Sequence, residues 1–341
     1  MWVLPGLINM HEHFMLRDIL GDPFEAMRKN AVETTLVAVG NAREALARGW
    51  TTVREMGSTH GIAQELRDRI AAGTVRGPRV VTAGSPICVT GGHANALCVE
   101  ADGVDACRRA ARGQLKAGAD FLKVMTSHEP YPMPGTEQTR AEMSPEEITA
   151  VFNEARSWGK GTACHAMGST AIGRVIDAHV DIVDHGHYLN DVLAHRMAEL
   201  GTYLCPTLSA YDRQTMNPKY RRTDEWIRAH EALVEPHQKA FRTAVREGVK
   251  IVAGTDTTGS YGEEVELIRE GGMSPMDSIL ACTRTAAEAL RLGDQIGRLD
   301  EGMVADVVLL DGDPMVDPRA LDHATLVMKA GISYKPSELR S

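Results

Sequence analysis

The 341-residue chain contains 43% hydrophobic and 24% charged residues, a composition typical of a folded protein with a self-supporting core. Its 37 basic and 46 acidic residues give a formal net charge of -9, and no Lys/Arg-rich run is present, which argues against nucleic-acid or membrane-surface binding. Six cysteines lack C-x-x-C pairs and the tight spacing of a disulfide framework. We therefore expect reduced thiols in a cytoplasmic protein without a targeting segment or membrane span.

Short apolar runs alternate with longer amphipathic stretches along the chain, a pattern typical of βα units around a parallel sheet. Eight such units favour an α/β fold of the closed (β/α)8 TIM-barrel type, and a doubly wound open sheet is the alternative. The predicted strands are Val3–Met10, Thr51–Met56, Arg79–Ala83, Phe121–Thr126, Gly161–His165, Ile182–His185, Thr202–Pro206 and Lys250–Thr255. Among the predicted helices, the one over 145–158 begins with Ser144 as its N-cap and a proline in its first turn.

The sequence changes character at about Gly293. Turn-forming residues are followed by two predicted strands, Ala305–Leu310 and Ala324–Lys329, with Asp/Gly/Pro-rich loops between them. We therefore predict two domains, a barrel over residues 1–293 and a small β-domain over 294–341.

Polar side chains stand at the carboxyl ends of several predicted strands, which form the reactive face of a barrel. His11 and His13, two residues apart on a strand, can face one metal ion, although two packing histidines are an equal alternative. The H-E-x-x-H helix motif is excluded because Met15 stands where the second histidine is needed. Asp256 ends the eighth strand, where it can bind a metal or cap a helix.

Three further side chains extend this pattern. Lys123 lies within an apolar strand, where an ammonium group is costly to bury; it either reaches the barrel rim or carries a CO2-derived carbamate. His165 and His185 each end a short apolar run, and we favour His185 over His187 because Gly186 begins the loop.

The segments Pro5-Gly-Leu-Ile-Asn-Met-His-Glu-His13 and Ala305-Asp-Val-Val-Leu-Leu-Asp-Gly-Asp313 resemble signature motifs of the metal-dependent amidohydrolase superfamily, and the resemblance covers nearly the whole chain. Asn9 replaces the usual aspartate of the first motif. Two more segments, Lys116–Val124 and Val183–Gly186, resemble the binuclear branch that contains Xaa-Pro and Xaa-Arg/Lys dipeptidases and ochratoxinase-like amidases.

The resemblance implies a site with two divalent metal ions, zinc being the expected element. His11, His13 and Asp256 would bind one ion and His165 and His185 the other, with a carbamate on Lys123 as the bridge. The resemblance further implies that His93 donates a hydrogen bond to the oxyanion that develops during the reaction, and that Tyr188 binds a substrate carboxylate. Arg213 is a second candidate for the carboxylate, with a surface role as the alternative.

These residues predict hydrolysis of an amide or peptide bond in a dipeptide, an N-acyl amino acid or an aryl amide. A hydroxide bridging the metals would attack the carbonyl carbon, and Asp256 would take the proton and pass it to the leaving amine. The alternatives are a mononuclear deaminase or cyclic amidase of the imidazolonepropionase type, which does not need Lys123, and a non-catalytic scaffold. Family members carry several strands before the first motif, where this sequence has only Met1–Leu4, so we expect an incomplete β-sandwich. A partner chain covering the open edge would make the protein a homo-oligomer.

Overall fold

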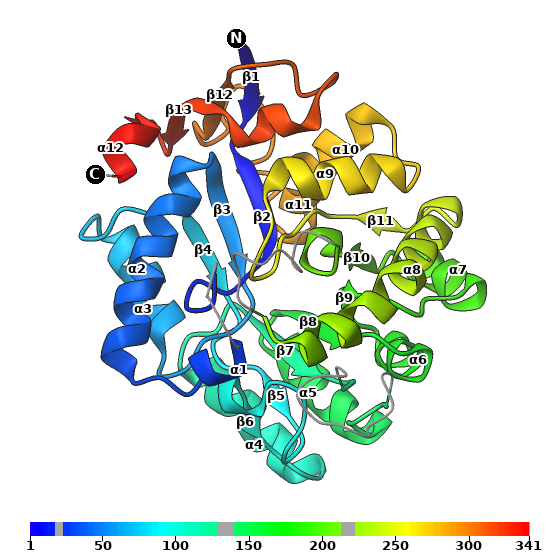
Figure 1. Ribbon diagram of the computed structural model, residues 1–341. Helices are drawn as coiled ribbons and strands as arrows, with labels where there is room; N and C mark the ends of the chain where they lie inside the picture. Colours follow the sequence, from blue (N-terminus) through cyan, green and yellow to red (C-terminus); the bar gives the residue numbers. More distant parts are fainter. Residues whose placement is uncertain (18–22, 129–139, 213–221, 341) are drawn as a thin grey trace.

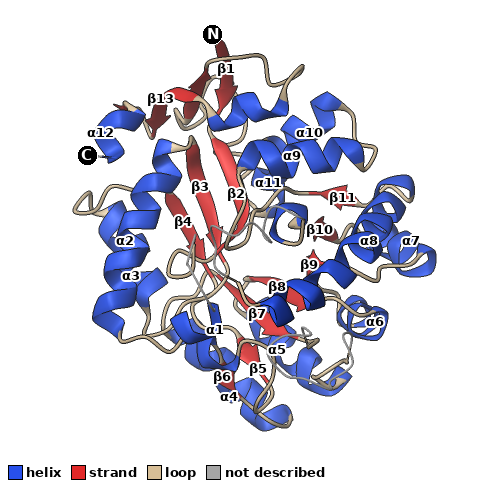
Figure 2. Ribbon diagram, viewed as in Figure 1, coloured by secondary structure: helices blue, strands red, loops and turns tan. Residues whose placement is uncertain are grey.

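The computed structural model describes residues 1–17, 23–128, 140–212 and 222–340. Eight parallel strands form a ring, and helices surround it (Figure 1; Figure 2). The barrel strands are β2 (Leu7–Glu12), β3 (Trp50–Glu55), β4 (Arg79–Thr82), β7 (Phe121–Met125), β8 (Gly161–Ala166), β9 (Ile182–His185), β10 (Tyr203–Cys205) and β11 (Lys250–Ile251). The predicted (β/α)8 barrel is therefore confirmed, and the doubly wound open sheet is excluded. Two short strands were not predicted: β5 (Ile87–Cys88), which pairs with β7, and β6 (Val99–Glu100), which pairs with β5.

Individual backbone hydrogen bonds close the ring where the regular strand ladders stop. Between the last strand and the first, the Met10 N–H donates to the Ala253 carbonyl and the Asp256 N–H donates to the His11 carbonyl, each at 2.9 Å. The Asp120 N–H donates to the Thr82 carbonyl at 2.8 Å and so joins β7 to β4. The carboxyl ends of all eight strands consequently meet around one opening.

The helices surround the barrel strands, except α12, which packs against α2 and β13. They are α1 (Pro23–Ala26), α2 (Ala31–Ala47), α3 (Ile62–Ala71), α4 (Val104–Lys116), α5 (Pro145–Ser157), α6 (Ser169–Asp177), α7 (Asp191–Leu200), α8 (Asp224–Arg246), α9 (Tyr261–Glu270), α10 (Pro275–Ala281), α11 (Arg284–Ala289) and α12 (Pro336–Arg340). Helix α5 begins as predicted, because Ser144 and Glu147 form a reciprocal capping box. The main core lies between strands and helices, with Leu46, Val53 and Ile172 fully buried.

A separate antiparallel sheet uses both ends of the chain. Strand β1 (Trp2–Pro5) pairs with β12 (Val307–Leu310), which is followed in the sheet by β13 (Ala324–Lys329) and β14 (Ile332–Tyr334). The two predicted C-terminal strands are confirmed, and β14 was not predicted.

The prediction of a single strand over Val3–Met10 was wrong, because the segment contains two strands in different sheets. The chain leaves the small sheet after Pro5 and enters the barrel at Leu7. Gly6 makes this change possible, since a Cβ atom there would overlap the side chain of Thr51 on β3. Both halves of the segment are apolar, so hydrophobicity alone does not reveal the boundary.

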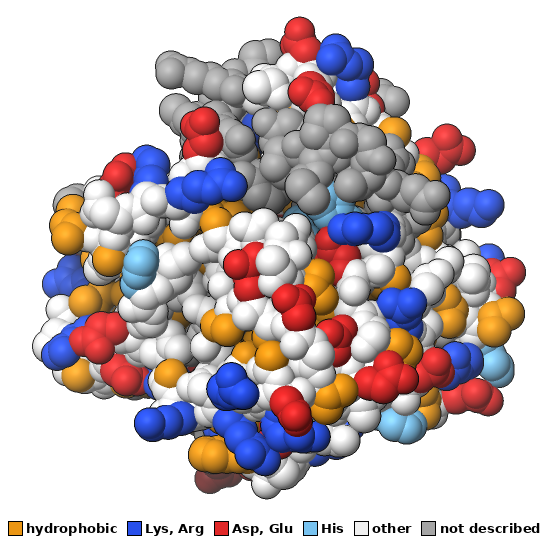
Figure 3. Space-filling model, turned by 90° about the horizontal axis from the view of Figure 1, so that it is seen from below, with side chains coloured by type: hydrophobic (Ala, Val, Ile, Leu, Met, Phe, Trp, Pro, Cys, Tyr) orange, Lys and Arg blue, Asp and Glu red, His pale blue; other side chains and the backbone are white. Residues whose placement is uncertain are grey.

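The distribution of charged side chains and the state of the cysteines match what the sequence led us to expect. Acidic and basic side chains are interspersed over the face shown in Figure 3. All six cysteines are free thiols. In the described part of the chain, no helix is long and apolar enough to cross a membrane.

Gly254 precedes Asp256 at the point where the ring closes, and we expect it to tolerate no side chain. A Cβ atom there would lie 2.7 Å from both the Cys205 Sγ and the His11 backbone nitrogen. Gly254→Ala should therefore lower the free energy of unfolding by about 1–3 kcal/mol, the usual cost of overpacking.

Chemical denaturation of the variant beside Gly40→Ala checks this expectation. Gly40 is exposed on α2 and has no atom within 4 Å of an added Cβ, so its replacement should stabilise the protein by up to about 1 kcal/mol. Equal stability of the two variants would contradict close contact at Gly254.

Candidate metal centre

The six side chains predicted as metal ligands line one pocket of about 90 Å³ at the carboxyl end of the barrel. They are His11, His13, Lys123, His165, His185 and Asp256. Their imidazole rings lie close together, with centroid distances of 5.4 Å for His11 and His13, 5.1 Å for His11 and His185, and 4.6 Å for His165 and His185. The structure therefore brings together residues that are far apart in the sequence.

His11, His13 and Asp256 form the tightest part of this group. The Nε2 atoms of both histidines lie 3.9 Å from the Asp256 Oδ1. One potential ligand atom from each residue lies within 4.8 Å of the other two. A single cation could therefore contact all three side chains, a donor set of nitrogen and oxygen that suits zinc.

The hydrogen bonds of the histidines leave Nε2 as the atom with a free lone pair. The His13 Nδ1 donates to the Gly57 carbonyl at 2.9 Å, since a carbonyl can only accept. The Thr207 hydroxyl donates to the Pro206 carbonyl, so the His185 Nδ1, 2.7 Å from the Thr207 Oγ1, donates to that oxygen. This tautomer is the one that binds a metal through Nε2.

Two buried ring nitrogens support the same conclusion. The Nε2 atoms of His11 and His165 have no hydrogen-bond partner among the described residues. Buried polar atoms are rarely left without a partner, and a metal ion would satisfy both. The donor set therefore fits the metal ions that the sequence motifs imply.

Burial lowers the pKa values of the histidine and lysine side chains in this pocket. It lowers the pKa of His11, His165 and His185 well below the usual value, and that of His13 to about 3, with the charge of Lys123 contributing in each case. Burial also lowers the pKa of Lys123 itself. Neutral imidazoles bind metals, and a neutral amine is the form that can react with CO2.

Strained backbone orients two of the candidate ligands. His185 and Asp256 have φ values of 75° and 54°, in the left-handed region that costs a non-glycine residue about 1–2 kcal/mol. Asp184 and His185 both face the barrel interior although side chains normally alternate along a strand, and the left-handed conformation of His185 accounts for this. His187 does not line the pocket; it is fully buried, and its ring stacks on His237 at 3.8 Å.

Asp184 is the main side chain that the sequence analysis missed. Its Oδ1 accepts hydrogen bonds from the His11 Nδ1 at 3.0 Å and from the Arg54 guanidinium. All three side chains are almost completely buried. Burial raises the pKa of Asp184, whereas the charge of Arg54 acts in the opposite direction. The carboxylate holds the His11 ring in place. Its position next to His185 at the end of a predicted strand was the available signal.

The other predicted site residues divide into those inside and outside the pocket. His93 lines it, and its ring stacks on His165 with centroids 4.0 Å apart. Tyr188 is not among the lining residues, whereas Tyr211 is, with its ring 5.5 Å from that of His185. Arg213 lies outside the described residues.

Helix α8 forms a wall of the pocket that the sequence did not predict. Trp226 and His230 line it, with their rings stacked at 3.6 Å, and Arg222 joins them just before the helix. Two helical turns after His230, the His237 Nε2 donates a hydrogen bond to the His185 carbonyl at 3.0 Å. The spacing of His230 and His237, seven residues apart on an amphipathic helix, was a signal for one buried face.

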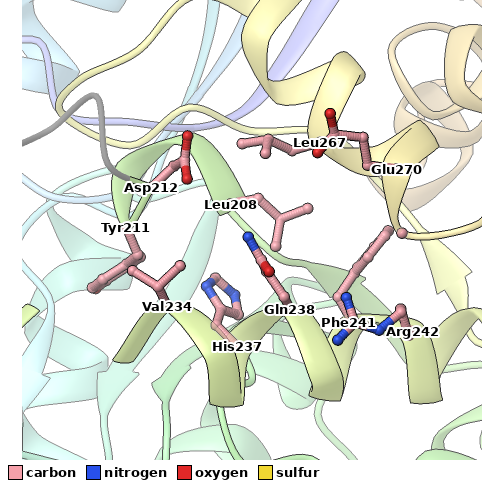
Figure 4. Close-up of a pocket in the computed structure, with 11 residues that line it drawn as sticks. Leu208, Tyr211, Asp212, Val234, His237, Gln238, Phe241, Arg242, Leu267 and Glu270 are labelled. Atoms are coloured by element: carbon pink, nitrogen blue, oxygen red, sulfur yellow. The ribbon is translucent and has the colours of Figure 1, made fainter. Parts of the chain in front are cut away.

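A smaller cavity of about 50 Å³ lies behind this wall, between α8 and α9. Figure 4 shows His237, Gln238 and Phe241 of α8 on one side and Leu267 and Glu270 of α9 on the other. Tyr211 lines both this cavity and the candidate metal pocket.

Comparison with known proteins places the chain in a family. The family model described as "Amidohydrolase family" matches residues 2–334, so the chain belongs to the amidohydrolase family, whose members are metal-dependent hydrolases. This confirms the superfamily predicted from the strand-end residues.

Three similar proteins have names that state an activity. Ochratoxinase from Aspergillus niger is 29% identical over 379 residues, covering 98% of this chain and 75% of the relative. The crystal structure of a Xaa-Pro dipeptidase with bound methionine in the active site is similar, with a TM-score of 0.88 and 28% identity over 98% of this chain and 86% of that one. Imidazolonepropionase from Mesorhizobium japonicum is 27% identical over 91% of this chain and 78% of the relative.

Asp184→Asn should destabilise the protein strongly. The substitution leaves the buried guanidinium of Arg54 without its counter-charge, and breaking a buried ion pair in this way costs about 3–5 kcal/mol. Asp177→Asn is the matched control, because Asp177 forms an exposed ion pair with Arg196. This substitution should change the free energy of unfolding by less than about 1 kcal/mol. Urea titration of both variants measures the difference; a small effect of Asp184→Asn would mean that Arg54 finds another partner.

Proposed function

We propose that the protein is a binuclear metal-dependent amidase or dipeptidase that cleaves an amide or peptide bond in a small substrate. The observation that carries the proposal is the convergence of six potential ligand side chains from five barrel strands on one pocket. Membership of the amidohydrolase family and the similarity to ochratoxinase and to a Xaa-Pro dipeptidase support it.

In this proposal, His11, His13 and Asp256 hold one divalent ion, and His165 and His185 hold the second. Lys123 lies between the two groups as a carbamate, formed when its neutral amine bonds to the carbon of CO2 and releases a proton. Zinc is the proposed ion because the donors are nitrogen and oxygen. When bound, the two ions supply a nucleophile at neutral pH and polarise the scissile carbonyl.

The remaining steps belong to the chain's own side chains. The Asp256 carboxylate takes the proton of the attacking water and passes it to the leaving amine. His93 donates a hydrogen bond to the carbonyl oxygen as negative charge develops there, and its stacking on His165 fixes the direction of that bond. No serine or cysteine nucleophile is required.

The α8 wall is the proposed substrate-binding region. Arg222 carries a positive charge suited to a substrate carboxylate, and Trp226 offers an apolar surface beside it, with the guanidinium 5.2 Å from the indole centroid. This chemistry fits a dipeptide, an N-acyl amino acid or an aryl amide that carries a carboxylate. Tyr188 stays a predicted contact for the same group, with weaker support because it does not line the pocket.

A mononuclear deaminase or cyclic amidase is the second candidate, favoured by the similarity to imidazolonepropionase. Lys123 discriminates between the two, because a single-metal site has no need of a lysine buried among four histidines. A non-catalytic scaffold is less consistent with a pocket in which all six side chains are present.

We further propose a cytoplasmic protein that associates as a homo-oligomer, with domains at 1–293 and 294–341 except that residues 2–5 belong to the small sheet of the second domain. The exposed side chain of Ile332 on the edge strand β14 supports association, since open strand edges favour pairing with another chain.

Metal analysis of protein purified without chelator and with bicarbonate should give two ions per chain. Lys123→Ala should reduce this to one or fewer, because the bridge between the two groups is lost. Lys329→Ala is the control, because Lys329 is a partly buried lysine of the small sheet that does not line the metal pocket. Its Nζ donates a hydrogen bond to the Gly77 carbonyl. One ion per chain in both the wild type and Lys123→Ala would favour the mononuclear candidate.

Hydrolysis of dipeptides, N-acyl amino acids and aryl amides, followed by amine release, tests the reaction. His93→Ala should lower kcat about 10²–10³-fold with little change in KM or metal content, as expected for loss of an oxyanion donor. His195→Ala, on the exposed side of α7, should have wild-type activity. An unchanged kcat in His93→Ala would remove His93 from the mechanism, and no hydrolysis of any substrate by the metal-loaded protein would contradict the proposed function.

A further inference from the structure

A second, larger cavity of about 370 Å³ lies at the opposite end of the barrel from the candidate metal centre. The first residues of four barrel strands line it, namely Arg79, Phe121, Gly161 and Ile182. The segment from Ala289 to Leu292, at the end of α11, forms another wall. None of the six candidate metal ligands takes part, so this cavity is a separate feature of the fold.

Basic side chains outnumber acidic ones around the cavity. Five lysine and arginine residues line it, against two aspartates. The basic residues are Arg54, Arg67, Arg79, Lys160 and Arg291. Arg67 pairs with Asp120 at 2.8 Å, Arg291 pairs with Asp181 at 3.3 Å, and Arg79 pairs with Asp306 at 2.6 Å. Within the described residues, Lys160 has no ion-pair partner, so the wall keeps a positive charge.

Arg54 is the residue that points to a ligand. Its side chain is 1% exposed; Nε donates to the Met10 carbonyl and Nη2 binds Asp184, but Nη1 has no hydrogen-bond partner among the described residues. A buried guanidinium donor without an acceptor is costly, because it has lost its hydration, and the Phe121 ring, 5.7 Å from the guanidinium carbon, compensates only in part. Arg54 also lines the cavity, so an anion that binds against this residue would bring an acceptor to the buried guanidinium.

The rest of the lining is apolar, which defines the other half of the ligand. Phe121 and Ile182 are buried at the barrel end of the cavity, and Val81, Leu290 and Leu292 line it further out. Inorganic phosphate would leave this surface without a partner. A carboxylate attached to an aryl or short alkyl group would pair with the basic residues and cover the apolar wall.

We propose that this cavity binds a small organic carboxylate with an apolar body, held by Arg54 and Lys160. The site is distinct from the candidate metal centre, and its existence does not depend on the proposed hydrolytic function. Arg54 binds Asp184, and Asp184 binds His11, so two side chains separate the ligand from the metal pocket.

Isothermal titration of the metal-loaded protein with benzoate tests the proposal, with benzamide as the uncharged control of the same shape. We expect one benzoate per chain and no heat from benzamide. Binding of inorganic phosphate in place of benzoate would overturn the proposed ligand class, and absence of benzoate binding would overturn the site.

Two variants locate the bound benzoate without disturbing the barrel core. Ala289→Trp places an indole in the cavity and should abolish binding, and Lys160→Ala should weaken it about tenfold. Both residues are partly exposed, so folding should be retained, as a thermal melt would verify. Benzoate binding that survives Ala289→Trp unchanged would place the ligand in the metal pocket instead and overturn the proposal. Metal content and hydrolysis measured on the same variant report separately on the proposed function.

Discussion

Closure of the barrel between β2 and β11 is the constraint on which the candidate site depends. The hydrogen bond from the Asp256 N–H to the His11 carbonyl brings the last candidate ligand next to the first two. Gly254 permits this approach because it has no side chain to collide with His11. The geometry of the site is therefore set by backbone contacts between the two ends of the barrel, and the imidazoles from the intervening strands complete it.

Burial has opposite consequences on the two sides of His11. Toward the pocket, loss of water keeps the histidines neutral and leaves Nε2 atoms available to a cation. Toward the barrel interior, the same loss of water requires that Asp184 and Arg54 stay paired. The imidazole of His11 therefore links a polar network inside the barrel to a pocket built for positive charge.

The sequence predicted those features that depend on local patterns. Strands buried on both faces appear as continuous apolar runs, so all eight barrel strands were found, and residues at their carboxyl ends could be assigned to one opening. The break at Gly6, the inward position of Asp184 and the α8 wall were missed. The first two depend on a contact between distant residues or on an unusual φ value, as at His185, and neither leaves a periodic pattern in the sequence. The α8 helix does carry a periodic pattern, but that pattern does not say which part of the barrel the buried face covers.

The pairing of β1 with β12 has a consequence for how the chain folds. Residues 2–5 pair with residues 307–310, so this part of the sheet can form only after the roughly 300 residues between them have been synthesised and residues 307–310 have left the ribosome. Trp2 and Val3 are more than 40% exposed even in the folded state. During synthesis, this apolar segment must wait for its partner strand, which makes it a natural binding site for chaperones and a place where premature association between nascent chains can begin.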